Sequence, residues 1–180
     1  GNGHTISNLH VSNHHVSGLF GVTLNTDIKN LNLKDFNIDN MSEMTEYSIL
    51  SGGTLMGLAL GNTSINNVSA TGSFDVHNGV YGGLVGALMP GGDTRSLLTS
   101  DFINQNYEYY NSDDYMTLDD LSTLKISNSS FSGTLEGDSS LESALGGLVG
   151  GCEYGNIIIE NSSMDGSICG ADMSSGIVCI

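Results

Sequence analysis

Apolar and polar residues alternate along much of this chain, in short runs bounded by Gly, Asn and Ser. Residues 5–11 alternate apolar and polar side chains apart from the adjacent Ser7 and Asn8, and residues 27–38 alternate again with one change of phase near Asn30. A period of two residues is typical of a strand with one buried face. The sequence has one proline and shows no convincing 3.6-residue period, so the pattern predicts an all-β fold of many short strands.

A four-residue block of the form Gly-apolar-apolar-Gly recurs through the chain. Its five copies occupy residues 18–21, 54–57, 83–86, 147–150 and 176–179, and the second and fifth copies have each lost one glycine. The last residues of successive copies lie 36, 29, 64 and 29 positions apart. The basic period is therefore 29 residues, and the longer intervals predict insertions at about 41–48 and 90–122. Repeats that accept insertions are typical of solenoid proteins.

A second block travels with the first. Residues 65–72, 126–133 and 159–166 share an Ile at the first position, an Asn at the third and a Gly at the eighth. Ile28 and Asn30 open the same block earlier in the chain, with Asp35 where the glycine is expected. Because both blocks recur in the same order, we expect residues 1–180 to form a single segment of stacked coils.

Together the two blocks resemble a known repeat. GGLVG at residues 146–150, followed by I-x-N-S-S-x-x-G at residues 159–166, is similar to the GLUG-motif repeats of large bacterial surface and secreted proteins. The opening GNGHTISNL is similar to the stretch that often leads into such repeats, and the resemblance covers nearly the whole chain apart from the insertions. It implies a right-handed parallel β-helix (β-solenoid) of about five coils and carries over no catalytic residue. Because the chain opens and stops inside repeat units, we expect an excerpt of a longer repeat protein.

The repeat predicts which side chains stack on one another. Neighbouring coils are about 4.8 Å apart, so equivalent residues form columns, and only glycine fits where a tight inward corner meets its own equivalents. One column is expected to face the interior: Leu19, Leu55, Leu84, Leu148 and Ile177. The adjacent column is also apolar, which indicates a face that is either covered or an interface: Phe20, Met56, Val85, Val149 and Val178.

A further column consists of asparagines, at Asn30, Asn67, Asn128 and Asn161. Stacked asparagines can form an amide ladder, in which each side chain bonds to the next. Asparagine is also a common turn former. The sequence leaves both interpretations open.

Charge excludes some partners. Four Lys and Arg residues stand against 20 Asp and Glu residues, for a formal charge of −16, so nucleic acid and anionic membrane surfaces are poor partners. No run approaches the ~20 apolar residues of a membrane span, so membrane insertion is not expected. With the resemblance, this composition predicts an extracellular protein, secreted or at the cell surface.

The cysteines and histidines give weak signals for a disulfide or a metal site. Cys152, Cys169 and Cys179 all lie in the last 29 residues. Cys152 and Cys179 are expected one coil apart but two residues out of register, which is marginal for a disulfide, and the alternative is reduced thiols that fill the stack. There is no CxxC pair for zinc. Four histidines lie among the first 15 residues, but strand alternation places them on both faces, so solvated histidines are expected.

The long insertion is the candidate recognition segment. Its tyrosines can stack on sugar rings, and its carboxylates could hold Ca²⁺ through oxygen ligands. The tyrosines are Tyr107, Tyr109, Tyr110 and Tyr115, and the carboxylates are Asp113, Asp114, Asp119 and Asp120. The alternative is a loop that folds its tyrosines against the coils and covers apolar side chains. Carbohydrate or a surface protein of a host or neighbouring cell is the expected ligand class, with calcium as the one candidate cofactor.

Catalysis is not expected within this segment. Asn25-Thr26-Asp27, Asp113-Asp114 and Gly3-His4 are each faintly similar to part of a polygalacturonase site, but the order of motifs and the Arg-x-Lys of that family are missing. The predicted function is a non-catalytic structural or adhesive module of a bacterial surface or secreted protein. The alternative is an accessory domain of a secreted hydrolase or peptidase, such as a glycan-degrading enzyme or an IgA-type metallopeptidase, whose catalytic domain lies elsewhere. In both cases neighbouring repeats, or self-association at the cut ends, are expected to cover the ends.

Overall fold

The computed structural model describes residues 1–41, 50–89, 121–138, 143–153 and 155–179, and in these ranges every regular element is a β-strand. The first sheet contains β1 (His4–Ser7), β2 (His10–Ser12), β5 (Asp27–Asn40), β8 (Thr63–Val76), β11 (Ser122–Ser127), β12 (Ser130–Gly137), β15 (Gly155–Glu160) and β16 (Ser163–Cys169). The second contains β3 (Val16–Ser17), β6 (Ser51–Gly53), β9 (Gly79–Gly82), β13 (Ser143–Gly146) and β17 (Met173–Ser175). The third contains β4 (Phe20–Leu24), β7 (Met56–Leu60), β10 (Val85–Met89) and β14 (Val149–Cys152). The predicted all-β class is confirmed for these ranges.

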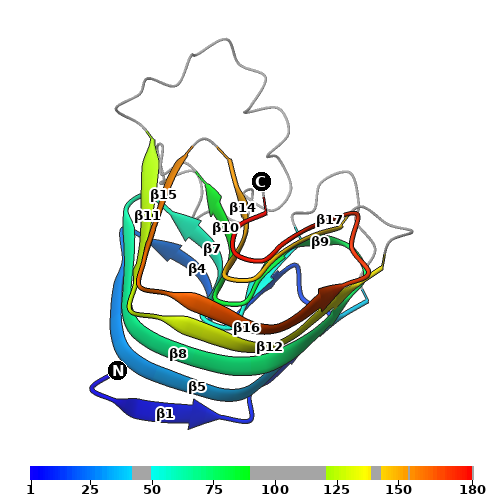
Figure 1. The fold of residues 1–180 in the computed structure, drawn as a ribbon, viewed down its shortest axis with the longest axis horizontal. Coiled ribbons are helices and arrows are strands. Elements are labelled where there is room, and N and C mark those ends of the chain that lie inside the picture. Colours follow the sequence, from blue (N-terminus) through cyan, green and yellow to red (C-terminus); the bar gives the residue numbers. More distant parts are fainter. Residues whose placement is uncertain (42–49, 90–120, 139–142, 154, 180) are drawn as a thin grey trace.

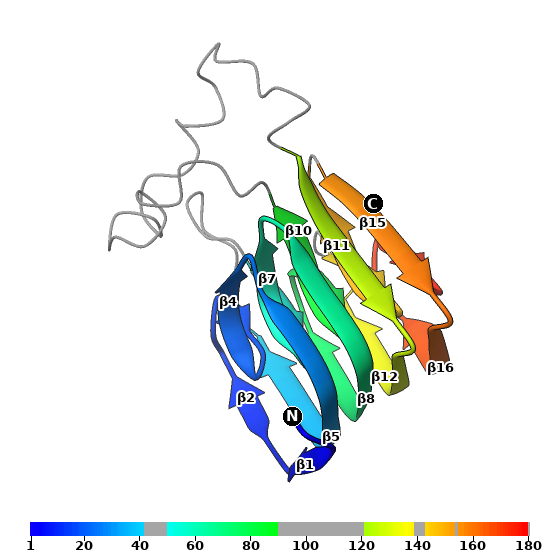
Figure 2. The ribbon, with the colours of Figure 1, turned by 90° about the vertical axis from the view of Figure 1, so that its left-hand side faces the viewer.

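All neighbouring strands in the three sheets run parallel. Along the chain, a long bent strand of the first sheet is followed by a short strand of the second, then by a strand of the third, and the path then returns to the first (Figure 1). Figure 2 shows the strands of the first sheet side by side, from β1 and β5 at the N-terminal end to β15 and β16 at the C-terminal end. Sequence order and spatial order therefore coincide.

The register of the third sheet confirms the predicted spacing. Phe20 pairs with Met56, Met56 with Val85, and Val85 with Val149. An isolated bridge then joins Val149 to Val178. These pairs are separated in sequence by the same 36, 29, 64 and 29 residues that separate the Gly-apolar-apolar-Gly copies. The five copies thus stack on one another as the sequence predicts.

The second block is also in register, in the first sheet. Its isoleucines pair in the order Ile28, Ile65, Ile126 and Ile159, and its glycines pair in the order Gly72, Gly133 and Gly166. An added Cβ on Gly133 would lie 1.9 Å from the carbonyl oxygen of Gly72. No side chain fits at that distance, so the glycine column is required by the close approach of stacked backbones.

Asp35 does not occupy the glycine column, contrary to the expectation from counting residues. Phe36 pairs with Gly72, because the register of β5 against β8 shifts by one residue between Leu33 and Phe36. Asp35 has φ +55° and belongs to a β-bulge, which adds one residue to one strand and bends it. The buried side chains of β5 therefore change phase twice, near Asn30 and again near Asp35, where only the first change is predicted.

Asparagine is the turn former in these sheets. Asn30, Asn67, Asn128 and Asn161 have φ between +48° and +56°, a left-handed conformation that asparagine adopts more readily than most residues. The Nδ2 of Asn67 donates to the Oδ1 of Asn30 at 2.7 Å. Among the described residues this is the one amide-to-amide bond within the column, so the turn interpretation holds for four asparagines and the ladder for one pair.

Both apolar columns are buried in the middle of the stack. Leu55, Leu84 and Leu148 are fully buried, as predicted, and Leu19 and Ile177 at the column ends are only partly covered. The adjacent column is fully buried at Met56, Val85 and Val149, so of the two alternatives this face is covered. Phe20, at the N-terminal end of that column, is 43% exposed. Burial thus depends on position along the stack.

Glycine at the fourth position has a steric cause as well in the middle copies. An added Cβ on Gly150 would lie 2.6 Å from the carbonyl oxygen of Gly86, and one on Gly86 would lie 2.4 Å from that of Gly57. Thr54 stands in the first glycine column and is accepted there, because its hydroxyl donates to the carbonyl oxygen of Gly83 at 2.6 Å.

Candidate functional site

The predicted recognition residues fall in a part of the chain that the structure does not describe. Tyr107, Tyr109, Tyr110 and Tyr115, with Asp113, Asp114, Asp119 and Asp120, all fall in residues 90–120, outside the described ranges. The predicted insertion at about 41–48 lies outside them too, apart from Met41. Any site built from described residues must therefore come from the sheets and their turns.

A shallow, open groove of about 390 Å³ lies where the third sheet passes into the first. We call it the corner groove. Its lining residues come from three successive levels of the stack: Asn25, Thr26 and Asp27; Asn62, Thr63 and Ser64; Thr123 and Lys125. Apart from one carboxylate and one ammonium, these side chains are amides and hydroxyls. These amides and hydroxyls can bond to a ligand that presents hydroxyl groups, while carbon atoms make up most of the exposed lining.

The asparagines of the corner groove are held in place by the backbone of the next level. The Oδ1 of Asn25 accepts from the backbone N–H of Asn62 at 2.9 Å, and the Oδ1 of Asn62 accepts from that of Thr123 at 3.0 Å. The side-chain oxygens of Asn25 and Asn62 are thus engaged in bonds between levels of the stack. These bonds fix the orientation of both side chains, so their Nδ2 groups are donors in defined positions one strand apart.

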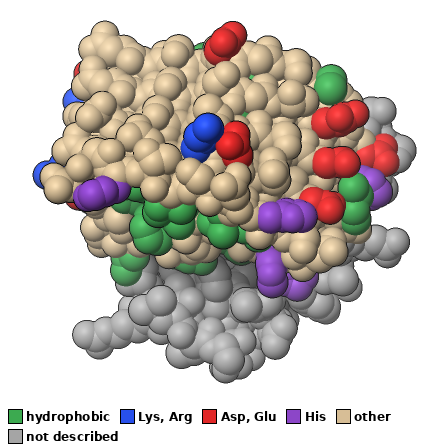
Figure 3. Space-filling model, turned by 90° about the horizontal axis from the view of Figure 1, so that it is seen from below, with side chains coloured by type: hydrophobic (Ala, Val, Ile, Leu, Met, Phe, Trp, Pro, Cys, Tyr) green, Lys and Arg blue, Asp and Glu red, His purple; other side chains and the backbone are tan. Residues whose placement is uncertain are grey.

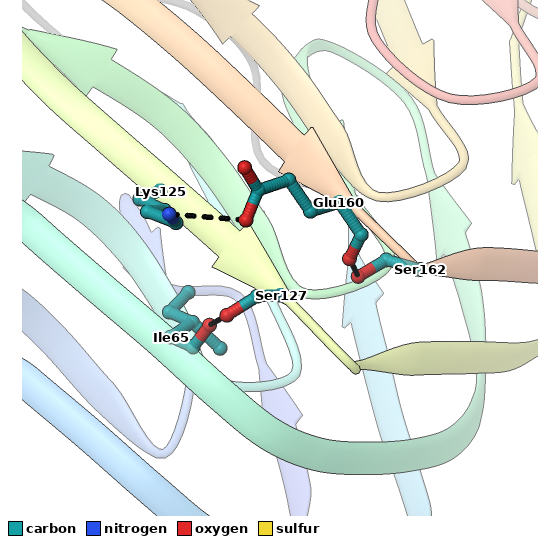
Figure 4. Close-up of polar contacts among 5 residues, drawn as sticks. All are labelled: Ile65, Lys125, Ser127, Glu160 and Ser162. Atoms are coloured by element: carbon teal, nitrogen blue, oxygen red, sulfur yellow. Dashed lines mark hydrogen bonds and ion pairs between the residues drawn. The ribbon is translucent and has the colours of Figure 1, made fainter.

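Lys125 and Glu160 form an ion pair beside the groove, with Nζ and Oε2 3.0 Å apart (Figure 4). Lys125 lies on β11 and Glu160 at the end of β15, and both side chains are about half exposed. A pair this exposed contributes about 0–1 kcal/mol at most. Its main effect is to neutralise the ammonium, which leaves Asp27 as the one unpaired charge among the lining residues.

Nearby hydroxyls are used by the turns. Figure 4 shows Ser127 directed at the carbonyl oxygen of Ile65, 3.5 Å away, and Ser162 directed at that of Glu160, 2.8 Å away. Thr63 differs, since it is buried and its Oγ1 has no hydrogen-bond partner in the described part of the chain. An unpartnered buried hydroxyl is costly, and because this oxygen is buried it is not offered to a ligand in the groove.

The groove does not present paired carboxylates. Hydrolysis of a glycosidic bond by two acids requires carboxyl groups ~5–9.5 Å apart, and Asp27 is the single carboxylate among the described lining residues. The stretch Asn25-Thr26-Asp27 therefore contributes a turn and a strand start here, and not a recognisable pair of acids.

Three thiols lie free near the C-terminal end: Cys152, Cys169 and Cys179. Val178 pairs with Val149, so Cys179 stands in the column of Gly150, as predicted. Cys179 is buried, Cys152 is half-buried and Cys169 is exposed. The alternative of reduced thiols that fill the interior of the stack therefore fits Cys179 but not the other two. Burial raises the pKa of the Cys152 thiol, a hydrogen bond from the Gly155 backbone lowers it in part, and the charge of Glu153 raises it again.

Metal ligands do not converge in the described sheets. No group of three or more His, Cys, Asp or Glu side chains is placed to hold a metal ion within these ranges. Nor does this part of the chain contain a helix long and apolar enough to cross a bilayer.

The outer face of the first sheet is mostly uncharged. Figure 3 shows this face with few charged side chains across its middle and a row of acidic ones near one border. Asp39 pairs with Asp75 and Asp75 with Glu136, which places three carboxylates in one column. Across β5 and β8, Ser69 donates to Asn32 at 2.7 Å and Ser73 to Asn37 at 2.8 Å. Small polar side chains therefore link successive levels on the surface.

The sequence missed a buried polar contact. Tyr81 on β9 is fully buried, and its hydroxyl accepts a 2.6 Å hydrogen bond from the Nδ2 of Asn40 at the end of β5. The same Nδ2 donates to the carbonyl oxygen of His14 at 2.9 Å. Burial raises the pKa of the Tyr81 phenol far above its ordinary value, and the bond from Asn40 offsets this only in part. Phe74 and Phe131 pack beside Tyr81 in the core. The ring centroid of Phe74 lies 5.9 Å from that of Phe131 and 6.5 Å from that of Tyr81.

Sheets and groove together define an all-β protein of stacked parallel strands with a polar groove at one corner. Comparison of the chain with protein-family models finds no match, and the comparisons with curated proteins and with solved structures find none either. Function must therefore be inferred from the geometry of this chain.

Proposed function

We propose that this chain is a segment of a right-handed parallel β-solenoid of about five coils, of the GLUG-repeat kind, and that it serves as a non-catalytic, adhesive module outside a bacterial cell. The observation that supports it is the register. Equivalent residues of five copies stack in one column, from Phe20 through Met56, Val85 and Val149 to Val178. Such a frame is rigid and extendable, and it can hold a recognition surface at a fixed distance from an anchor.

Carbohydrate is the ligand class that best suits the frame. The formal charge of −16 disfavours polyanions. The corner groove offers amide and hydroxyl groups in fixed positions, and its ammonium is already paired with Glu160. A neutral polysaccharide presents hydroxyl groups at regular intervals, so it can bond to successive levels of the stack. Tyr107, Tyr109, Tyr110 and Tyr115 are the rival surface, with Ca²⁺ at Asp113, Asp114, Asp119 and Asp120.

A glycan array with the whole chain, run with and without Ca²⁺, tests the proposal. On the best neutral glycan, Ser64→Lys and Asp27→Ala should each lower affinity about tenfold or more, since the first fills the groove and the second removes its carboxylate acceptor. Ser132→Lys, a matched change on the outer face of β12, should have no effect. If instead replacing Tyr109, Tyr110 and Tyr115 with Ala abolishes binding while the groove variants bind normally, the tyrosine segment is the site. If no glycan binds, the carbohydrate proposal is wrong.

A further inference from the structure

The sequence contains five triplets of the form Asn-x-Ser in which the middle residue is not proline. They occupy residues 40–42, 62–64, 67–69, 128–130 and 161–163. This triplet is the acceptor motif for an N-linked sugar, which is attached to the side-chain nitrogen of the asparagine. A triplet alone does not define a site, because Asn and Ser are common in this chain. The structure separates the five by whether the asparagine amide is exposed and unengaged.

Three of the five asparagines are buried or engaged. Asn40 is 1% exposed, so its amide is out of reach of an enzyme. The Nδ2 of Asn67, which is the nitrogen that would accept a sugar, donates to the Oδ1 of Asn30 at 2.7 Å. Asn62 lies in the corner groove, and its side chain is held by a bond to the backbone of the next level. These three are therefore not expected to be acceptors.

Asn128 and Asn161 differ from the other three, because they are exposed and unengaged. Each is the first residue of a corner that joins two strands of the first sheet, β11 to β12 and β15 to β16. Their φ angles of +49° and +48° are left-handed. Within the described ranges neither side chain forms a hydrogen bond. Both Nδ2 groups are therefore open to an enzyme.

The corners are held by the middle residue of each triplet. The Oγ of Ser129 donates to the carbonyl oxygen of Ser127 at 2.8 Å, and the Oγ of Ser162 donates to that of Glu160 at 2.8 Å (Figure 4). The backbone N–H of Ser129 donates to the Oγ of Ser162 at 3.1 Å. Because the serines and the backbone make these contacts, the asparagine amides can be modified without breaking a bond of the fold.

The third residue of the triplet gives a further distinction. Ser130 and Ser163 pair with each other across β12 and β16, and within the described ranges neither hydroxyl forms a hydrogen bond. Ser69, the third residue of the Asn67 triplet, instead donates to the Oδ1 of Asn32 at 2.7 Å. Amide and hydroxyl are thus both unengaged at residues 128–130 and 161–163, and both engaged at residues 67–69.

We propose that Asn128 and Asn161 are acceptor sites for an N-linked glycan, added by a transferase whose donor is a sugar carried on a diphosphate. The Nδ2 attacks the anomeric carbon of the sugar, so a C–N bond forms as the C–O bond to the diphosphate breaks. The diphosphate leaves with the electron pair of that bond, and the nitrogen gives one proton to the transferase. The proposal does not depend on carbohydrate binding by the corner groove, so either can fail alone.

The two acceptors are neighbours in one column. The flanking residues of their corners pair directly, Ser127 with Glu160 and Ser130 with Ser163. Neighbouring parallel strands are about 4.8 Å apart, which is no wider than a sugar ring. A first glycan therefore hinders the second, and most chains should carry one adduct.

Mass spectrometry of the whole chain, isolated from the cells that produce it, tests the proposal. Cleavage after Asp and Glu places the two acceptors on separate peptides, 121–136 and 161–165, and places Asn62 and Asn67 together on a third, 47–75. Sugar should be found on the first two peptides and not on the third. A single-sugar adduct indicates a nucleoside diphosphate as the carrier, and an oligosaccharide of one size indicates a lipid diphosphate.

Variants at one corner test the assignment. Asn128→Gly removes one acceptor and retains the left-handed backbone, so sugar should be lost from peptide 121–136 and should increase on peptide 161–165. Ser130→Ala removes only the hydroxyl and should have the same effect, whereas Ser130→Thr retains the motif and should be modified like the wild type. Ser132→Ala lies outside every triplet and is the matched control.

Three results overturn the proposal. They are a wild-type chain with both acceptor peptides unmodified, an adduct on peptide 121–136 that survives Asn128→Gly, and an adduct there that survives Ser130→Ala. Each variant is first checked by circular dichroism for the wild-type β-spectrum. Asn161→Gly and Ser163→Ala, the equivalent changes at the second corner, replace any variant that fails this check, and each should remove the sugar from peptide 161–165.

Discussion

Asparagine accounts for eight of the nine positive-φ positions outside glycine in the described chain, and Asp35 is the ninth. These residues allow the strands to turn corners without a glycine at every coil. Asn128 is the cleanest example, because it is exposed, has φ +49° and lies between β11 and β12. Left-handed backbone costs a β-branched residue roughly 1–2 kcal/mol, while glycine adopts it freely.

Asn128→Val should therefore lower the free energy of unfolding by about 1–2 kcal/mol, whereas Asn128→Gly should change it by less than about half of that. Urea unfolding monitored by circular dichroism measures both. Equal losses in the two variants would show that the asparagine side chain, and not the backbone angle, is what the corner requires.

Tyr81 gives the fold a dependence on alkaline pH. The raised pKa keeps its phenol protonated in the folded state, while the unfolded chain ionises its tyrosines near pH 10. The unfolded state thus releases the proton first, so the contribution is complete below about pH 10 and is lost as pH rises from there toward the raised pKa. Tyr81→Phe should remove this part of the pH dependence and cost about 1 kcal/mol at neutral pH through the bond to Asn40.

Unfolding measured between neutral and strongly alkaline pH checks the Tyr81 prediction. The Cys152 thiol contributes with the same sign, because its pKa is raised as well, so Cys152→Ser serves as the background for the comparison. If the free energy of unfolding of Tyr81→Phe falls with rising alkaline pH as steeply as that of the Cys152→Ser background, the ionisation of Tyr81 does not contribute to the pH dependence of stability.

At the scale of elements, the contribution of a stacked side chain to the free energy of unfolding depends on its position within its column. Leu148 has a column neighbour on each side and is fully buried, whereas Ile177 ends the same column and is 38% exposed. Leu148→Ala should cost about 2–5 kcal/mol through lost burial and a cavity. Ile177→Ala is the matched control and should cost much less. Similar losses measured by denaturant unfolding would show that the end of the column is covered in solution.

The strands and their stacking could be predicted from the sequence, because a repeat makes each coil a prediction for the next. The pairing of Ile65 with Ile126 and of Val85 with Val149 follows from aligned copies. The bulge at Asp35 could not be found in this way, since a step of three between buried residues occurs at any corner. The corner groove was missed although its residues recur with the spacing of the isoleucines, because Asn, Thr and Ser are equally expected in any turn and so do not mark a site.

The contact between Asn40 and Tyr81 was missed for a similar reason. It joins residues 41 positions apart in sequence, which is not a multiple of the 29-residue period. A repeat predicts contacts between equivalent positions, and a bond between unequal positions lies outside what alignment of copies can show. The predicted tyrosine and aspartate site lies in residues 90–120 and stays a prediction.

At the scale of the molecule, the register has a consequence for the order of folding. Most neighbouring levels pair residues 27–37 positions apart, but Val85 and Val149 are 64 apart, and Ser69 and Ser130 are 61 apart. Closing a chain twice as long costs about 0.6 kcal/mol more entropy, and slow pairing follows from large separation in sequence. The seam between β8 and β12, with that between β10 and β14, is therefore expected to form last.

In pulse-labelled hydrogen exchange, amides of β5 and β8 should become protected together, those of β15 and β16 should do so independently, and the amides that bridge the seam should follow. The molecule would then mature as two blocks zipped along one line, so a ligand that holds both sides of the line would speed the final step.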